Sequence, residues 1–333
     1  MAPALLLVAA SGPVMHLLSL SRQGIAFLWG DYGAVVGSIN TDIVLRVSRV
    51  PLHGENLMAQ ELTVGRGGKG SNCALAVSRL GARSAMVGAV GADAYGQEAL
   101  GALEAAGVGV AGVQRCEAST GLAMILVDDQ GENTIVVARG ANDRLAPAHV
   151  QLALDQTDPD VVIMNYEVPL ECVQAALDWA DGHDRLAVLD AGPARHERPE
   201  RWGRRTVLTA NQAEIACLLD CDADDDAALS AGVSDLLGEG LYGVVVKLGG
   251  RGAHLQAQGV VADVPAFDVP VVDTTGAGDA STAALALALA ADIPWREAVR
   301  YANAAGAVTV TRLGAAAAMP TADEIQALLD RSG

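Results

Sequence analysis

The chain has 333 residues, of which 51% are hydrophobic, 3% are aromatic and 37 are glycine. This length suits one large α/β domain or two small ones, and the shortage of aromatic residues requires a core built from Ala, Val and Leu. The formal net charge of −18 argues against a nucleic-acid backbone or an anionic membrane as the partner, although local N–H groups can still bind a phosphate.

Residues 1–30 are predicted to be an extension outside the fold. The apolar stretch 4–10 is too short to span a bilayer, and no Lys or Arg precedes it, as one would in a secretory signal. An export signal is the alternative. The five cysteines form no C-x-x-C pair, which favours free, buried thiols in a reducing compartment and a cytoplasmic protein.

The first core strand is predicted to begin at Tyr32 and to end at Val36, just before the stretch 37–42, Gly-Ser-Ile-Asn-Thr-Asp. Asn40 and Asp42 are two residues apart, so on an extended chain their side chains face the same side. Such a pair at the end of a strand can hydrogen-bond a polyhydroxy ligand. A turn closed by these two side chains is the alternative.

A glycine-rich stretch, Gly65-Arg66-Gly67-Gly68-Lys69-Gly70-Ser71-Asn72, leads into a helix predicted over 73–80 and closed by Gly81. It is not a Walker loop, because Gly70 follows Lys69 where Ser or Thr is required. It still brings a flexible backbone, a lysine and an asparagine to the start of a helix. A solvated surface lysine is the alternative interpretation of Lys69.

Two parts of the chain are predicted to form a small second sheet. Residues 43–64 suggest short strands without helical periodicity, and 122–127 with 134–138 flank a polar turn, which indicates a hairpin. Strands and helices alternate regularly after Val150, as in a mostly parallel sheet covered on both faces. Polar residues follow several of these strands, at the sheet edge where ligands of such folds bind. They are Glu167, Asp190, Asn211 and Lys247.

The stretch 272–280, Val-Asp-Thr-Thr-Gly-Ala-Gly-Asp-Ala, precedes a helix predicted over 280–291. Gly276 and Gly278 let a ligand approach the backbone, and the unpaired N–H groups at the helix start form an anion site. A carboxylate at that site suits a general base that takes a proton from a hydroxyl attacking a phosphoryl group. The alternative is that Asp279 caps its own helix.

These motifs, with Asn211-Gln212-Ala213-Glu214, resemble the ribokinase family, the pfkB-type carbohydrate kinases, in order and spacing from about residue 34 to the end. The resemblance implies a doubly wound, mostly parallel α/β domain over 34–330 with a small β lid at about 43–66 and 119–140. It also implies an ATP-dependent sugar kinase that phosphorylates the primary hydroxyl of D-ribose. The alternatives are another sugar, a nucleoside or a sugar phosphate as the substrate, or a non-catalytic sugar-binding regulator.

The resemblance also implies the roles of individual residues. Asp279 would be the catalytic base beside an anion hole of Gly276, Ala277 and Gly278. The sugar would be held by Asn40, Asp42, Gly68, Lys69, Gly70, Asn72, Glu167 and Asp279. ATP and Mg²⁺ would be placed by Asn211, Glu214, Lys247, Leu248, Gly249, Gly250, Arg251, Gly252, Gly278 and Asn303.

A potassium site is the last implication, together with a homodimer formed through the lid. The cation's ligands would come from Asp273, Thr275, Thr309, Arg312 and Gly314, and Ala318 stands where a serine hydroxyl often adds one more. A sugar and ATP are the expected partners. No nucleic acid and no membrane are expected.

Overall fold

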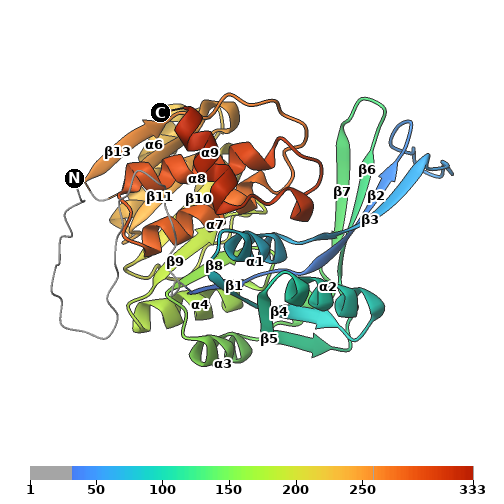
Figure 1. Cartoon of the computed structure of the whole chain (residues 1–333), viewed down its shortest axis with the longest axis horizontal. Coiled ribbons are helices and arrows are strands. Elements are labelled where there is room, and N and C mark those ends of the chain that lie inside the picture. The colour runs from blue at the N-terminus through green and yellow to red at the C-terminus, as the bar shows by residue number, and fades with distance from the viewer. Residues whose placement is uncertain (1–31, 258, 333) are drawn as a thin grey trace, which may run out of the picture.

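The computed structural model describes residues 32–257 and 259–332. The predicted extension over 1–30 lies outside these residues. Two sheets of different size organise the chain. The larger sheet forms the body, and the smaller one stands beside it at the right of Figure 1. The predicted fold class, a mostly parallel α/β sheet with a second small sheet, is confirmed.

The large sheet has nine strands in the order β13-β12-β11-β10-β9-β8-β1-β4-β5. All neighbours are parallel except β12, which runs antiparallel to both β11 and β13. This antiparallel edge was not predicted. The strands are β1 Tyr32–Val36, β4 Arg83–Gly91, β5 Val108–Cys116, β8 Val161–Asn165, β9 Leu186–Asp190, β10 Thr206–Asn211, β11 Gly243–Lys247, β12 Ala253–Ala257 and β13 Val260–Val264.

Helices cover both faces of this sheet, because consecutive side chains of each strand point to opposite sides. Val35 packs into one buried cluster with α1, α2, α7, α8 and α9, whereas Ala34 and Val36 pack into the other with α3, α4, α5 and α6. The helices are α1 Lys69–Arg79, α2 Ala94–Ala105, α3 Pro147–Thr157, α4 Leu170–Gly182, α5 Gln212–Leu219, α6 Asp226–Gly238, α7 Ala277–Ala290, α8 Trp295–Thr309 and α9 Ala322–Arg331, with short 3-10 turns at Gly140–Arg144, Gly249–Arg251 and Ala316–Ala318.

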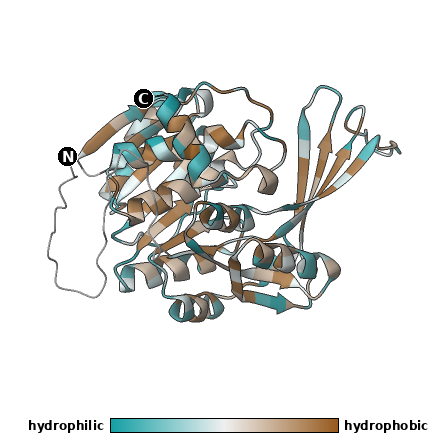
Figure 2. Ribbon diagram, in the orientation of Figure 1, coloured by the Kyte–Doolittle hydropathy of each residue, from teal (hydrophilic) through white to brown (hydrophobic). Residues whose placement is uncertain are grey.

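The small sheet, here called the lid, contains β3 Glu61–Gly67, β2 Asn40–Arg46, β6 Gly121–Val127 and β7 Asn133–Ala138, in that order. The predicted hairpin is present, since β6 pairs antiparallel with β7. Hydrophobic residues occupy much of the lid strands (Figure 2). Among the residues that the structure describes, no helix covers the lid as helices cover the body, and every residue of β7 is exposed.

Two predicted helix starts are wrong, and both errors fall at the site motifs. The first site helix begins at Lys69 rather than Cys73, and the second begins at Ala277 rather than Ala280. In each case the glycine before the helix has positive φ, 94° at Gly68 and 79° at Gly276, so the chain enters the helix earlier than the apolar pattern indicates. The chemistry-bearing residues therefore lie in first helical turns.

The structure also bears on the expectations for the cysteines and for the membrane. All five cysteines are free, but only Cys73 and Cys172 are buried, so the expectation of buried thiols holds for two of them. Within the described parts of the chain, no helix combines the length and apolar character that crossing a bilayer requires.

Candidate active site

One cavity of about 870 Å³ lies where the lid, the carboxyl ends of the body strands and the start of α7 meet. Most of the predicted site residues line it, although they come from segments far apart in the sequence. The predicted lining residues are Asn40, Asp42, Gly68, Lys69, Asn72, Glu167, Asn211, Glu214, Lys247, Gly249, Gly250, Gly252, Thr275, Gly276, Ala277, Gly278, Asp279 and Asn303.

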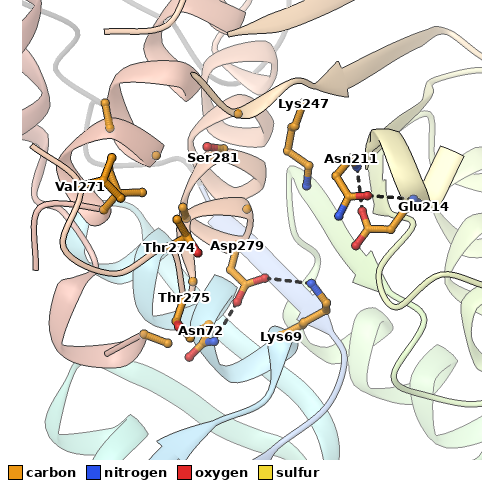
Figure 3. A pocket seen from close by; sticks show the side chains of 18 of the residues that line it. Lys69, Asn72, Asn211, Glu214, Lys247, Val271, Thr274, Thr275, Asp279 and Ser281 are labelled. Atoms are coloured by element: carbon orange, nitrogen blue, oxygen red, sulfur yellow. Dashed lines mark hydrogen bonds and ion pairs between the residues drawn. The ribbon is translucent and has the colours of Figure 1, made fainter. Parts of the chain in front are cut away.

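Asp279 is the third residue of α7 and is 5% exposed. The N-cap position belongs to Gly276, so the alternative in which Asp279 caps its own helix is not supported. Asn72 Nδ2 donates to Asp279 Oδ2 over 2.8 Å, and Lys69 Nζ lies 3.7 Å from Oδ1 (Figure 3). Burial raises the pKa of Asp279 to about 6, although the Lys69 ammonium opposes this shift. The carboxylate is ionised at neutral pH and able to accept a proton.

Lys69 is not a surface lysine, because its side chain is only 27% exposed and faces carboxylates. Burial alone would lower the pKa of Lys69, but Asp279, Asp190, Glu214 and Glu167 together raise it well above its ordinary value. Lys69 is therefore a fixed positive charge at the centre of the cavity.

Asn40 and Asp42 lie on the first strand of the lid and not in a turn, so the alternative for this pair is wrong. Asn142 Nδ2 donates to Asn40 Oδ1 over 2.7 Å, which fixes the side chain of Asn40. Asp42 lies against Gly67, where any side chain would meet its carboxylate. Burial raises the pKa of Asp42 to about 6, with further contributions from Glu167 and Asp279.

Glu167 closes the same end of the cavity. Its Oε2 accepts the backbone N–H of Lys69 over 3.0 Å and the hydroxyl of Ser38. The carboxylate thereby holds the start of α1 beside the end of β1. Lid residues Ala123, Ile125, Ile135 and Val137 cover this polar end with apolar side chains.

The opposite end of the cavity is a largely apolar slot. Its walls come from the loop after β13 and from α8, and Asn303 is held there by a hydrogen bond of 3.0 Å to the Val264 carbonyl. Asn211 and Glu214 lie between the two ends and form a reciprocal capping box at the start of α5 (Figure 3). The apolar residues of the slot are Phe267, Val269, Val271, Ala307 and Val310.

Some predicted site residues do not line the cavity. Gly70 packs against the backbone of Gly37 and Ser38, where a Cβ would clash at 2.6 Å. Arg251 extends from the loop and donates to Gln212 over 2.9 Å. Leu248 packs against the core beneath that loop.

Of the predicted potassium ligands, Thr275 lines the cavity, whereas the others do not. Asp273 accepts the N–H of Thr275 at 2.9 Å and that of Gly314 at 2.8 Å, so its carboxylate joins two loops. Partial burial alone would raise the pKa of Asp273, but these hydrogen bonds outweigh it and lower the pKa. The Thr309 carbonyl accepts the N–H of Arg312 over 3.2 Å, and buried Ala318 offers no side-chain oxygen.

Asn142 is the residue whose part in the site was missed. Asp190 was expected at the ligand-binding edge as a strand-end residue, and it ends β9, but nothing nearby in the sequence reveals its partners. Asn142 has no local signal at all, because it acts on Ile39 and Asn40 across more than a hundred residues.

Known proteins resemble the chain over most of its length. The pattern of the pfkB family carbohydrate kinases matches residues 31–322. A ribokinase of Schizosaccharomyces pombe is 37% identical over 87% of this chain and 95% of its own length, and a ribokinase of Bacillus subtilis is 35% identical over 89% and 98%. The solved structure of an Arabidopsis thaliana ribokinase complexed with ribose and ATP superimposes with a TM-score of 0.78, at 28% identity over 90% of this chain and 98% of that one.

Proposed function

The chain belongs to the pfkB family of carbohydrate kinases, and from that premise we propose that it transfers a phosphoryl group from ATP to the primary hydroxyl of D-ribose. The products are ribose 5-phosphate and ADP. One observation carries the proposal: a buried carboxylate, Asp279 in the first turn of α7, faces Asn72 and Lys69 in the cavity. The ribokinases among its relatives and the solved complex with ribose and ATP support the choice of sugar and nucleotide.

In the proposed mechanism Asp279 takes the proton of the attacking hydroxyl. Asn72 holds one oxygen of this carboxylate, which leaves Oδ1 on the side of Lys69. The hydroxyl oxygen then bonds to the phosphorus as the bond to the ADP oxygen breaks. A base of this kind contributes roughly 10²–10⁴ in rate.

The sugar binds at the polar end of the cavity. Asn40, Asp42 and Glu167 bring an amide and two carboxylates to one place, which suits a ligand with several hydroxyl groups. A buried polar group built to pair with a hydroxyl is left unpaired when the hydroxyl is missing, so such a site rejects deoxy analogues strongly. The apolar lid residues above exclude water from the reacting atoms.

The nucleotide occupies the remaining length of the cavity. The backbone amides at the start of α7, from Gly276, Ala277 and Gly278, receive the transferring phosphoryl group, with the helix dipole aligned toward it. The apolar slot takes the adenine beside Asn303. The loop 247–252 lies between the adenine and the transferring phosphoryl group. Preorganised donors of this kind account for much of the catalysis in phosphoryl transfer.

Magnesium is proposed to bind with the nucleotide phosphates. Across the part of the chain that the structure describes, no group of three or more His, Cys, Asp or Glu could hold a metal ion. This fits Mg²⁺, which keeps several waters and uses one or two carboxylates together with substrate phosphates. Glu214 would be the carboxylate and Asn211 its neighbour. When bound, the ion neutralises charge on the phosphates.

A monovalent cation, K⁺, is proposed to bind beside the anion hole. Asp273 supplies an ionised carboxylate that contacts two of the other predicted ligand residues, Thr275 and Gly314. A carboxylate with backbone carbonyls suits a hard cation. Ala318 contributes only its backbone.

A homodimer through the lid is proposed on the apolar face that points away from the cavity. Along β6 and β7, residues that line the cavity alternate with residues of this outward face. The strand register places the residues of the outward face side by side. Lids without helical cover need another partner to bury such a face. The face comprises Ile43, Leu45, Leu62, Val64, Leu122, Met124, Leu126 and Val136. The free cysteines are consistent with a cytoplasmic enzyme.

A substrate panel tests the proposal. Purified protein with ATP and Mg²⁺ is given ribose, 2-deoxyribose, fructose 1-phosphate and a nucleoside, and ADP release is measured. The highest kcat/KM is expected for ribose. Equal values for ribose and 2-deoxyribose, or a preference for fructose 1-phosphate, would reject the sugar while leaving the kinase assignment in place.

A further inference from the structure

Lysine is confined to the active site of this protein. The whole sequence contains two lysines, Lys69 and Lys247, and the other residues in its count of 22 Lys and Arg are arginines. Both lysines line the cavity, Lys69 from the start of α1 and Lys247 from the end of β11 (Figure 3). Their ammonium groups both lie beside the start of α7 (Figure 3). Lys69 Nζ is 3.7 Å from Asp279 Oδ1, and Lys247 Nζ lies beside Gly278, 3.4 Å from where a Cβ would be.

A single carboxylate, Asp190 at the end of β9, contacts both lysines. Asp190 Oδ2 accepts from Lys247 Nζ at 2.5 Å, and Oδ1 lies 3.9 Å from Lys69 Nζ. Asp190 is only 1% exposed, and its pairing with Lys247 leaves that lysine 19% exposed.

The orientation of Asp190 is itself fixed by neutral donors. The hydroxyl of Thr282 donates to Oδ2 at 2.8 Å, that of Thr209 does so at 3.3 Å, and the N–H of Gly192 donates to Oδ1 at 2.9 Å. Thr282 lies one helical turn after Asp279 on α7, so the helix that carries the base also holds Asp190. Burial alone would raise the pKa of Asp190, but Lys247 and Lys69 outweigh it and keep the carboxyl ionised.

We propose that Asp190 is the positioning residue of this active site, holding Lys69 beside the base and Lys247 beside the anion hole. Lysine has a flexible stem that samples many rotamers, so an ammonium group in a cavity needs a fixed counter-charge to occupy one place. With one carboxylate between them, the two positive charges bracket the place where a phosphoryl group would transfer. The inference rests on the proposed kinase function.

Because the chain has only two lysines, the reactivity of each amino group toward an acetylating reagent can be measured separately. The intact protein is trace-acetylated with sulfosuccinimidyl acetate, without sugar or nucleotide, and the modification of each lysine is quantified by peptide mass spectrometry against added N-acetyl-lysine amide. In Asp190→Asn, acetylation of Lys69 should rise by about tenfold, the effect of one pKa unit on its fraction of free amine. Acetylation of Lys247 should also rise, because its amino group loses the carboxylate that it contacts at 2.5 Å. The matched control is Asp93→Asn. It removes a carboxylate that accepts comparable hydrogen bonds, from Gly96 and Thr120, without a lysine partner. Its two lysines should react as in the wild type.

Turnover provides the second measurement. With ribose and ATP saturating, Asp190→Asn should lower kcat by on the order of 10²-fold, since misplacing groups by about 1 Å costs that much. Unchanged lysine acetylation in a folded Asp190→Asn protein overturns the proposal, whatever happens to kcat. A kcat within about threefold of wild type overturns it as well, being far below the loss expected for misplaced groups.

If Asp190→Asn does not fold, Asp190→Glu replaces it, because the longer side chain keeps the charge but moves it. It should lower kcat about tenfold through displaced ammonium groups, and wild-type kcat in this variant overturns the proposal. Failure of the proposed function can be distinguished from failure of the positioning role. If the proposed function is wrong, the wild type shows no ribose-dependent ADP release, whereas the acetylation pattern is unaffected.

Discussion

Asn72 and Asp279, 207 positions apart in the sequence, are joined by a hydrogen bond of 2.8 Å from the amide to the carboxylate. The two residues lie in the first turns of α1 and α7, which pack against each other. The bond therefore ties the rotamer of Asp279 to the packing of two helices. The carboxylate is oriented before any substrate binds.

Asp279→Asn should abolish turnover while sparing the fold. The amide keeps the size of the side chain but cannot accept the proton of the attacking hydroxyl, so kcat should fall by roughly 10²–10⁴. ADP release with saturating ribose measures this, and Asp235→Asn on the exposed surface of α6 serves as the control. A variant that retains more than about a tenth of wild-type kcat contradicts the role of Asp279 as the base.

The pH dependence of kcat/KM for ribose should report the ionisation of Asp279. Burial raises the pKa of Asp279 to about 6, and catalysis needs the ionised form, so the rate should fall as the pH drops through about 6. Asp42 has a pKa of about 6 as well, raised first by burial. The acid limb should persist in Asp42→Asn, because the base remains. A profile that is flat between pH 5 and 8 in the wild type would be inconsistent with this assignment.

Asn142→Ala should raise KM for ribose with a smaller effect on kcat. Asn142 does not line the cavity but accepts from the N–H of Ile39 at 2.9 Å and donates to Asn40 at 2.7 Å. Its removal frees the sugar-binding amide of Asn40 and leaves buried groups unpaired, which costs about 1–3 kcal/mol of stability. Initial rates over a range of ribose concentrations, with a thermal melt in parallel, separate the two effects. An unchanged KM would show that Asn40 does not depend on Asn142.

Potassium should raise kcat/KM several-fold over a buffer that contains only bulky organic cations, with sodium less effective. A cation that draws carbonyls to one side of the 273–279 segment aligns its amides on the other, and losing one such donor can cost roughly 10²–10³ in rate. The titration is made on rigorously alkali-free enzyme. The same titration on Asp273→Ala should be flat, and a wild type that does not respond to K⁺ excludes the site.

Val136→Glu should convert a dimer into a monomer. Val136 is 67% exposed on the outward face of the lid, where a charge would be buried on association. The dissociation constant, measured by sedimentation equilibrium, should rise at least about tenfold, or 1.4 kcal/mol. Leu152→Glu, at a position 54% exposed on α3, is the matched control. A wild type that is monomeric at all concentrations excludes this interface.

The sequence predicted the fold and the centre of the site because both depend on local patterns. Alternating strands and helices gave the sheet, and Gly276-Ala277-Gly278-Asp279 marked the anion site beside its base. What it could not supply were contacts between distant segments. Asp190 meets Lys247, Lys69 and Thr282 only through the parallel order of β9, β10 and β11 and the packing of α7 on the sheet. The antiparallel edge of β12 and β13 was missed because each strand has only 5 residues, too few for its alternation to stand out in the sequence.

The lid carries part of the substrate site on its own strand. Asn40 and Asp42 belong to β2, whereas Asp279 belongs to the body, and glycines stand at three of the crossings between them, Gly37, Gly68 and Gly140. Two of these have positive φ, 94° and 51°, a conformation that residues with a side chain rarely adopt. Any rotation of the lid about these connections would move Asn40 and Asp42 away from Asp279. Lid opening would therefore weaken the hold on the sugar, so that lid opening and product release would be coupled.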